Sequence, residues 1–147
     1  MNRYGLVLAA LAAAALAGCQ SMSSSGGPAL ASAGLMATKG NKTVGEVTFE
    51  QLDGKVRVNA QVIGLKPNQE HVLQIHQVGN CASGDGMGVG GLSASLPGLK
   101  ADAKGRGKLA ADVGSISVGS GPTGVVGRGI VVQAGDARLA CGVIKAN

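Results

Sequence analysis

The stretch His71-Val-Leu-Gln-Ile-His-Gln-Val-Gly-Asn-Cys81 holds both histidines of the chain and one of its three cysteines. A second stretch, Arg138-Leu-Ala-Cys-Gly-Val-Ile144, lies near the C-terminus and carries another cysteine. The first is an apolar, strand-like run that leads into its cysteine, and the second is a similar run built around one. Together the two stretches predict a β-barrel that is closed by a disulfide.

The composition restricts the core to small aliphatic side chains. The 147 residues contain one Phe, one Tyr and no Trp, against 26 Gly. Val, Ile, Leu and Ala must therefore build the core, which suits a compact β-structure with glycine at turns and bulges. The length corresponds to one domain.

The positive charge is spread thinly along the sequence. The formal net charge is +5, and no run of Lys or Arg stands out. Because almost no aromatic side chain is present to stack on bases, the pattern argues against nucleic-acid binding. We interpret the charge as a mixed, solvated surface, with a basic surface for an anionic membrane or polymer as the alternative.

The N-terminus predicts a secreted, lipid-anchored protein. Asn2 and Arg3 precede an apolar run at 6–17, which has the length of a signal peptide and is short for a membrane span. The run ends in Leu16-Ala-Gly-Cys19, which resembles the lipobox of bacterial lipoproteins. The resemblance implies cleavage before Cys19, acyl chains on its sulfur and amino group, and a stable membrane anchor. Gln20, in place of Asp, predicts sorting to the outer membrane of a Gram-negative cell.

Three segments follow from this interpretation. Residues 1–18 are predicted to be the signal peptide. Residues 19–40, which are rich in Ser, Gly and Ala, are predicted to be a lipidated flexible tether. Residues 41–147 are predicted to form the folded domain on the periplasmic face of the outer membrane.

The lipid assignment also settles the cysteine count. With Cys19 acylated, Cys81 and Cys141 remain, in a compartment where disulfides persist. A bond between them would close a loop of about 60 residues and contribute roughly 4 kcal/mol on the chain-entropy model.

The apolar pattern along residues 41–147 is that of an all-β protein. Asp53-Gly54 is a hairpin signal between two alternating runs, and no helical periodicity interrupts the pattern. Seven or eight short strands at this spacing predict a sandwich or barrel. The expected strands lie at 44–52, 55–63, 71–78, 92–102 (weakly), 107–113, 115–118, 125–133 and 138–145.

Several motifs together resemble one known family. They are Gly45–Phe49, Gly64-Leu65, His71–His76 with Gly79-Asn-Cys81, Leu96-Pro-Gly-Leu99, Val126–Gly135 and Arg138–Ile144. These segments, spanning about residues 40 to 145, resemble copper–zinc superoxide dismutase. The resemblance implies an eight-stranded Greek-key β-barrel with the Cys81–Cys141 disulfide of that family. Arg138 matches its anion-guiding arginine.

The chain departs from this family at the metal ligands. Of the four copper positions, the second is His76, whereas Gln74 and Gln133 stand at the first and the last. An amide is a weak neutral ligand, and tight redox-active copper needs several imidazoles. Gln74 and Gln133 lie on different strands, and we interpret them as a polar bridge.

The family's loops are shortened as well. The segment for the bridging histidine and the zinc ligands is missing, because Gly90-Gly91 runs almost directly into Leu92 and Leu96-Pro97. No zinc ligand can therefore be placed. The electrostatic loop before Arg138 is reduced to Asp136-Ala137. His71 matches a structural position, and the preferred interpretation of Arg138 is a hydrogen-bonding residue at the surface or at the disulfide.

Three functional hypotheses follow. The first is a superoxide-dismutase-like lipoprotein that has no dismutase activity and acts as a binding or structural module for an envelope partner. The second is a copper-binding protein that uses His76, with His71 or with Met87, Met22 or Met36 as soft ligands. The third is a dismutase whose missing ligands come from another chain.

Overall fold

The computed structural model describes residues 27–147. The predicted signal peptide 1–18, the lipidation site Cys19 and the first part of the predicted tether lie outside the described residues. Within residues 27–147, no helix has the length and apolar character needed to cross a membrane.

The described chain is all-β, and each pair of named strands is antiparallel. The strands run in the order β5-β4-β8-β9-β1-β2-β3-β7, with β10 paired to β1 and β6 paired to β4. Their bounds are β1 Leu30–Ala37, β2 Val44–Leu52, β3 Lys55–Ile63, β4 Glu70–His76, β5 Leu92–Ser95, β6 Leu99–Lys100, β7 Gly107–Val113, β8 Gly129–Ala134, β9 Ala137–Val143 and β10 Lys145–Ala146. One short 3₁₀ turn, η1, spans Met87–Val89.

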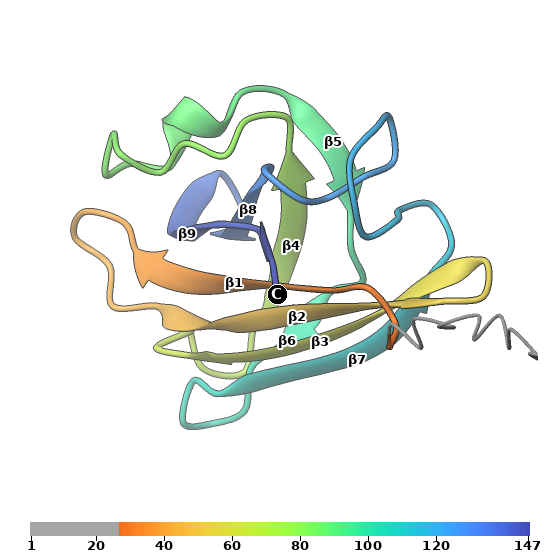
Figure 1. The fold of residues 1–147 in the computed structure, drawn as a ribbon. Coiled ribbons are helices and arrows are strands. Elements are labelled where there is room, and N and C mark those ends of the chain that lie inside the picture. Colours follow the sequence, from red (N-terminus) through yellow and green to blue (C-terminus); the bar gives the residue numbers. More distant parts are fainter. Residues whose placement is uncertain (1–26) are drawn as a thin grey trace, which may run out of the picture.

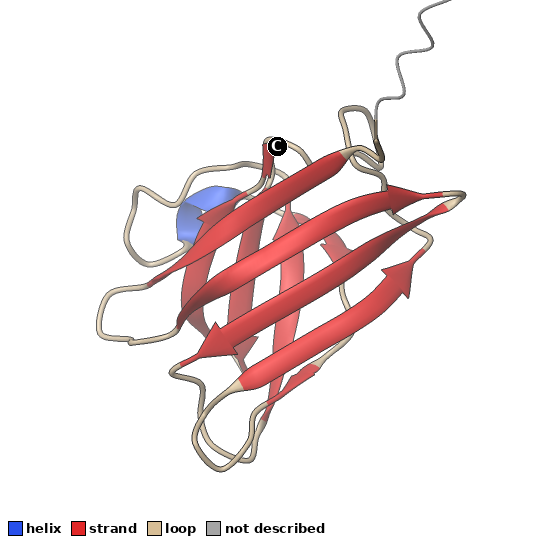
Figure 2. Cartoon of the chain, turned by 60° about the horizontal axis from the view of Figure 1, so that its bottom comes forward, coloured by secondary structure: helices blue, strands red, loops and turns tan. Residues whose placement is uncertain are grey.

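The sheet curls into two layers. In Figure 1, β1, β2, β3 and β7 form the lower layer, and β4, β5, β8 and β9 lie above it. Figure 2 shows the broad face of the lower layer with the other strands crossing behind. At one end β6 links the two free edges, because Leu99 pairs with His71 of β4 and Ala101 forms a bridge to Gly107 of β7. The result is a curled, barrel-like sheet around one core.

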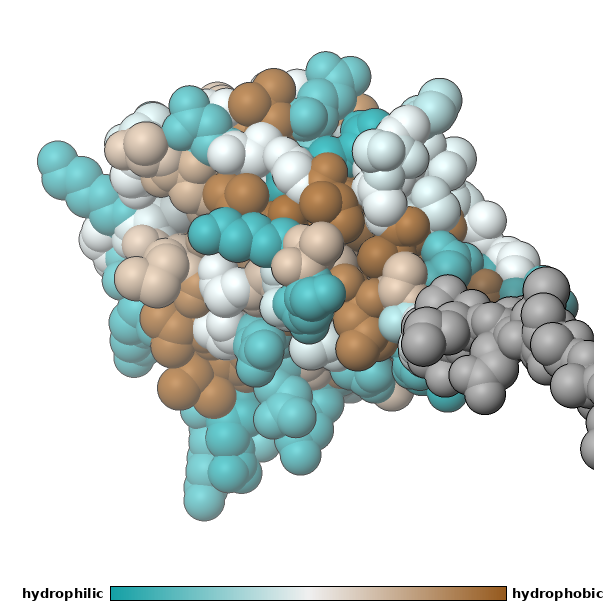
Figure 3. All heavy atoms as spheres, viewed as in Figure 1, coloured by the Kyte–Doolittle hydropathy of each residue, from teal (hydrophilic) through white to brown (hydrophobic). Residues whose placement is uncertain are grey.

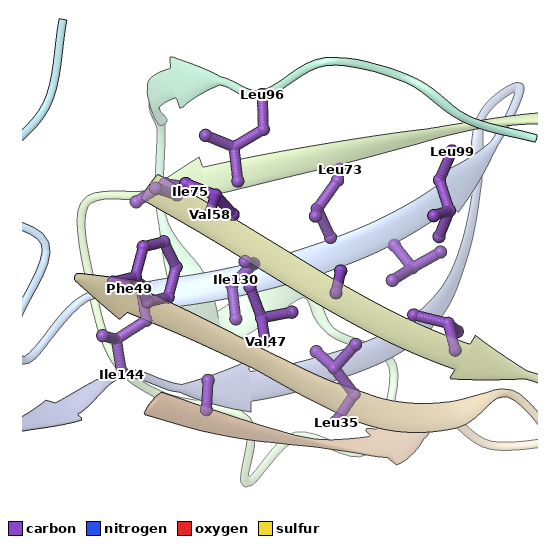
Figure 4. Packing of buried hydrophobic residues seen from close by; sticks show 14 of the residues in the cluster. Leu35, Val47, Phe49, Val58, Leu73, Ile75, Leu96, Leu99, Ile130 and Ile144 are labelled. Atoms are coloured by element: carbon purple, nitrogen blue, oxygen red, sulfur yellow. The ribbon is translucent and has the colours of Figure 1, made fainter. Parts of the chain in front are cut away.

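The core is built as the composition predicted, from small aliphatic side chains around one phenylalanine. In β3 the alternation is complete, since Val56, Val58, Ala60 and Val62 are buried and the residues between them are exposed. Figure 4 shows Phe49 and Val47 of the lower layer packed against Ile130 of the upper layer. The hairpin signal between β2 and β3 is confirmed, because Gly54 adopts φ +70° at the turn.

The domain begins earlier than the sequence predicts. Residues 30–37 were expected in the flexible tether, but they form β1, which lies between β2 and β9. Its buried side chains, Ala31, Ala33 and Leu35, alternate with residues that face out. Two of the three are alanines, so the alternation is weak in hydrophobicity and the Ser/Gly/Ala composition hides it. The boundary at residue 41 is therefore wrong.

The strand expected at 125–133 also begins later, at Gly129. Arg128 donates hydrogen bonds to the carbonyls of Gly121, Pro122 and Gly124, which holds the preceding segment as a compact loop. The short strand expected at 115–118 is reduced to a bridge between Ser117 and Gly124.

Replacing Phe49 tests whether this single aromatic ring is the packing centre of the core. Phe49 is 1 % exposed, and Phe49→Ala leaves a cavity that the small surrounding side chains cannot fill. We expect the free energy of unfolding to fall by about 3–5 kcal/mol, measured by urea denaturation followed by circular dichroism. The milder truncation Phe49→Leu, which keeps an aliphatic side chain in the same place, should cost clearly less than Phe49→Ala. Equal losses in the two variants would contradict the prediction.

Candidate functional site

The two histidines of the chain lie on opposite faces of β4. They are five positions apart, and successive side chains of a strand point to alternate faces. His71 shares the inner face with Leu73 and Ile75, which belong to the core cluster. His76 lies on the outer face, yet it is only 4 % exposed. The strand itself therefore separates the two imidazoles.

His71 is fully engaged in the backbone around it. The backbone N–H of Lys66 donates to its Nε2 at 3.2 Å, and its Nδ1 lies 3.1 Å from the carbonyl oxygen of Gln69. Because a carbonyl can only accept, the tautomer is assigned with the proton on Nδ1. Both ring nitrogens are then satisfied, and the ring ties the β3–β4 connection to the start of β4.

His76 has one ring nitrogen satisfied and one left over. Its Nδ1 lies 3.0 Å from the carbonyl oxygen of Gly90, so the proton is assigned to Nδ1. Its Nε2 is buried and has no hydrogen-bond partner among residues 27–147. A neutral imidazole that donates Nδ1–H to a backbone carbonyl and keeps a free lone pair on Nε2 is arranged as metal-binding histidines are.

The residues around His76 do not provide further imidazoles or carboxylates. No group of three or more His, Cys, Asp or Glu side chains that could hold a metal ion occurs in the described part of the chain. Gln74 lies opposite Val131 on β8, and Gln133 lies opposite Val72, so the two amides are diagonal neighbours on half-buried positions. They form no hydrogen bond with each other in this part of the chain, so the predicted bridge is not made.

The described methionines that were considered as soft ligands for His76 are both exposed. Met36 is 71 % exposed on β1, which is three strands from β4 in the sheet, or roughly 14 Å at the usual strand spacing. Met87 is 63 % exposed at the start of η1. Met22 falls outside the described residues. The two described methionines face solvent, so the structure does not assemble them around His76.

The loop at 77–91 covers this face of the sheet. Its two ends are held together by backbone hydrogen bonds from Gln77 to Gly91 and from Val78 to Val89. Val89 then packs with Val131 and the Cys81–Cys141 disulfide in a second, smaller apolar cluster. The predicted disulfide is confirmed, with 60 positions between the two cysteines. It joins the loop to β9.

The Arg138 side chain holds the same loop through a hydrogen bond to the loop's backbone. Its Nη1 donates to the carbonyl of Gly86, a residue that is buried against the Arg138 side chain. The hydroxyl of Thr38 donates to the Arg138 carbonyl at 2.6 Å, which links the arrangement to β1. Arg138 therefore acts here as a hydrogen-bond donor that supports the disulfide loop.

Asp85, an acidic residue of the same loop, accepts hydrogen bonds from its neighbours. Asp85 accepts hydrogen bonds from the Ser83 hydroxyl and the Met87 N–H, and these, together with the charge of Arg138, lower its pKa. The carboxylate thus stays ionised and organises the turn at 83–87. It is exposed and forms no part of a ligand set with His76.

Gly86 and Gly90 are the site residues that sequence reasoning missed. Each contributes a backbone carbonyl, to Arg138 and His76 respectively. Their partners are 52 and 14 positions away in the chain. A backbone oxygen leaves no mark on residue identity, so the Gly-rich composition of the loop was the only signal.

Comparison with known proteins gives one fold-level result. No protein-family model and no curated protein sequence matches the chain. Among solved structures, the chain is similar to the crystal structure of the clock protein EA4, with 26 % identity and a TM-score of 0.66. The alignment covers 82 % of this chain and 96 % of that one. The all-β, barrel-like fold is thus shared with a solved protein over nearly its whole length.

Removing the disulfide should destabilise the whole domain. With 60 positions between the cysteines, the double variant Cys81→Ala/Cys141→Ala should lower the free energy of unfolding by about 4 kcal/mol on the chain-entropy model. Urea denaturation of the oxidised and variant proteins measures the difference. Wild-type protein kept reduced with dithiothreitol is the control and should match the variant. An unchanged midpoint in both samples would contradict the prediction.

Proposed function

We propose that this protein is a superoxide-dismutase-like envelope lipoprotein that has no dismutase activity and serves as a binding or structural module. One observation carries the proposal: the only two imidazoles of the chain point to opposite faces of β4, and His71 has both ring nitrogens occupied by backbone groups. A single chain therefore cannot bring two imidazoles to one ion.

Topology supports the family part of the proposal. The chain crosses between the two layers from β3 to β4 and again from β7 to β8, which is the kind of connection found in a Greek-key barrel. The disulfide joins the segments that carry the family's two cysteine motifs. These features support the resemblance found in the sequence motifs, although fold by itself does not assign an activity.

The residues present do not fit the copper–zinc pair of that family. The free Nε2 of His76 supplies one imidazole, and the neighbouring positions offer the amides of Gln74 and Gln133. Neutral amides compete poorly for copper, and one imidazole cannot hold a tetragonal redox site. Ligands from another chain would reach Nε2 only after the 77–91 loop moved, since His76 is 4 % exposed beneath it. We therefore derive no dismutation step for this chain.

A dismutation assay tests the absence of activity. Full-length protein in neutral detergent is loaded with Cu²⁺ and Zn²⁺, and the decay of superoxide is followed by stopped flow. We expect no acceleration beyond that of His76→Ala treated in the same way. Metal-dependent dismutation by the wild-type protein that is lost in His76→Ala would overturn the proposal.

A second candidate function is copper binding at His76, and the buried, unpartnered Nε2 is the observation that favours it. Titration of the full chain with Cu(I) and with Cu(II), against a competing chelator, decides the matter. The copper function requires binding tighter than that of His76→Ala and equal to that of the matched control Met87→Ala. Equal affinities in wild type and His76→Ala would reject it.

The lipid anchor is the remaining part of the proposal. Its support is the Leu16-Ala-Gly-Cys19 motif behind an apolar run, because several acyl chains give stable membrane attachment. In a Gram-negative host, the wild-type protein should incorporate labelled palmitate and sediment with outer membranes. Cys19→Ser should lose both properties while the domain still folds, as judged by circular dichroism. Membrane attachment that survives this substitution would contradict the lipoprotein assignment.

A further inference from the structure

We propose that one end of the barrel is a docking surface for a flexible linear polyanion, a polymer with closely spaced phosphate or carboxylate groups. The surface, here called the basic pole, consists of Lys42, Lys66, Lys100, Lys104, Arg106 and Lys108. All six residues are exposed. They come from three connections or strand ends that lie far apart in the sequence, which is why no charge run marks them.

Two adjoining hollows show that these cations gather in space. Lys42, Lys66 and Lys104 line the first hollow, beside Pro67 and Leu139. Lys100, Arg106 and Lys108 line the second, beside Asn68 and Asp102. Polar side chains project at the lower left of Figure 3, where Figure 1 places the β3–β4 and β6–β7 connections.

The two connections are held side by side by backbone hydrogen bonds. The N–H of Leu65 donates to Gly105, and the N–H of Asn68 donates to Asp102. Gly105 lies so close to the Leu65 carbonyl that a Cβ atom would approach it to 2.5 Å, and its φ is +73°. Because the backbone contacts are this tight, the spacing of the lysines is set by the fold and not by their own side chains.

Most cations of the pole form no salt bridge within the described residues. Among the described residues, Arg106 alone of the six forms a salt bridge, with Asp102 at 3.1 Å. Two further carboxylates lie near the pole: Glu70, opposite Lys100 on the neighbouring strand, and Glu46, which shares a register row with Gln61 and Lys108. Neither forms a salt bridge within the described chain, so five lysines remain free to meet an anionic partner.

Four of the six cations elsewhere in the described domain are engaged by other groups, whereas Lys39 and Lys145 form no salt bridge among residues 27–147. Lys55 and Arg57, on the outer side of the lower layer, both pair with Asp112, at 2.9 and 3.0 Å. Arg128 and Arg138 donate to backbone carbonyls. Six of the twelve lysines and arginines in residues 27–147 thus lie at the pole, although the sequence shows only a thin spread of positive charge.

The chemistry of the pole favours a flexible polymer. Five of its six cations are lysines, which act as compact point charges and do not demand bidentate geometry. The one phenylalanine is buried in the core, and no other aromatic residue occurs in residues 27–147, so bases have no stacking platform. Binding would then follow charge density and counterion release, which a flexible chain laid across both hollows satisfies.

The position of the pole argues against the anchoring membrane as the partner. β1 begins at Leu30, beside Glu50 and the β2–β3 hairpin, and runs toward the pole over eight residues, or about 26 Å. This distance is several times the Debye length of about 8 Å at physiological salt. If the chain is anchored at Cys19, as proposed above, it enters the domain at the end opposite the pole. This orientation rests on the proposed lipid anchor, whereas the clustering of charge does not.

The test compares wild-type full-length protein, in neutral detergent, with two charge-matched triple variants. The pole variant is Lys42→Gln/Lys66→Gln/Lys104→Gln, and the control is Lys55→Gln/Arg57→Gln/Lys145→Gln. Binding to fluorescently labelled polyphosphate and polyglutamate is measured by anisotropy over a range of salt concentrations. Vesicles of phosphatidylcholine with phosphatidylglycerol form a third arm.

We expect the wild type and the control to bind at least one polymer, with the pole variant at least tenfold weaker. The slope of log K against log salt should fall by about 2 in the pole variant, which corresponds to three lost phosphate contacts on a flexible strand. A preference for one polymer identifies the anion. The proposal is overturned if the wild type binds neither polymer, if both variants lose affinity equally, or if vesicles bind more tightly than the polymers. Since the signal does not depend on Cys19, a failed lipid anchor and a failed pole are distinguishable.

Discussion

The hydrogen bonding of β1 is the constraint on which the rest of the structure depends. Residues 30–35 pair with β2, whereas Met36 and Ala37 pair with β9. One strand thus connects the lower layer to the upper layer, and the two halves of the sheet curl around a common core because β1 belongs to both. Without it, β9 and β2 would both be edge strands, with open rows of backbone donors and acceptors.

The loop at 77–91 covers the outer face of the upper layer, and residues at the end of β1 help to hold it there. Lys39, just after β1, donates from its backbone to Gly84, and Thr38 donates to the Arg138 carbonyl. The disulfide and Arg138 then hold the 77–91 loop down on β8 and β9. The burial of His76 follows from these contacts, since the loop places the Gly90 carbonyl against its ring. The outer face of β4 around His76 is in this way closed by backbone.

Charge in this protein is arranged by how connections meet and not by runs of residues. Asp112 accepts hydrogen bonds from Arg57 and pairs with Lys55, which lowers its pKa and neutralises the charges on that side. The connections after β3 and β6 carry lysines that form no salt bridge among the described residues, and backbone hydrogen bonds hold the two connections side by side. A thin spread of positive charge along the sequence can therefore coexist with a cluster of lysines at one end of the domain.

The sequence by itself determined the fold class, most strand positions and the disulfide, because these depend on local patterns. The alternation in β3, the Asp53-Gly54 turn and the two cysteine-bearing strands are readable from residue types alone. The separation of His71 from His76 was readable from the sequence, since an odd spacing on a strand means opposite faces, but His71 was instead considered as a second ligand beside His76.

Only the tertiary structure decided the extent of the domain, the state of each imidazole and the location of the charge. β1 was hidden because alanine alternation carries little hydrophobic signal, and its identity as a strand comes from partners on both sides. The partners of His76 and Arg138 are backbone carbonyls, which any residue could supply. The lysines of the basic pole meet through contacts between distant loops, and such contacts have no signature in sequence order.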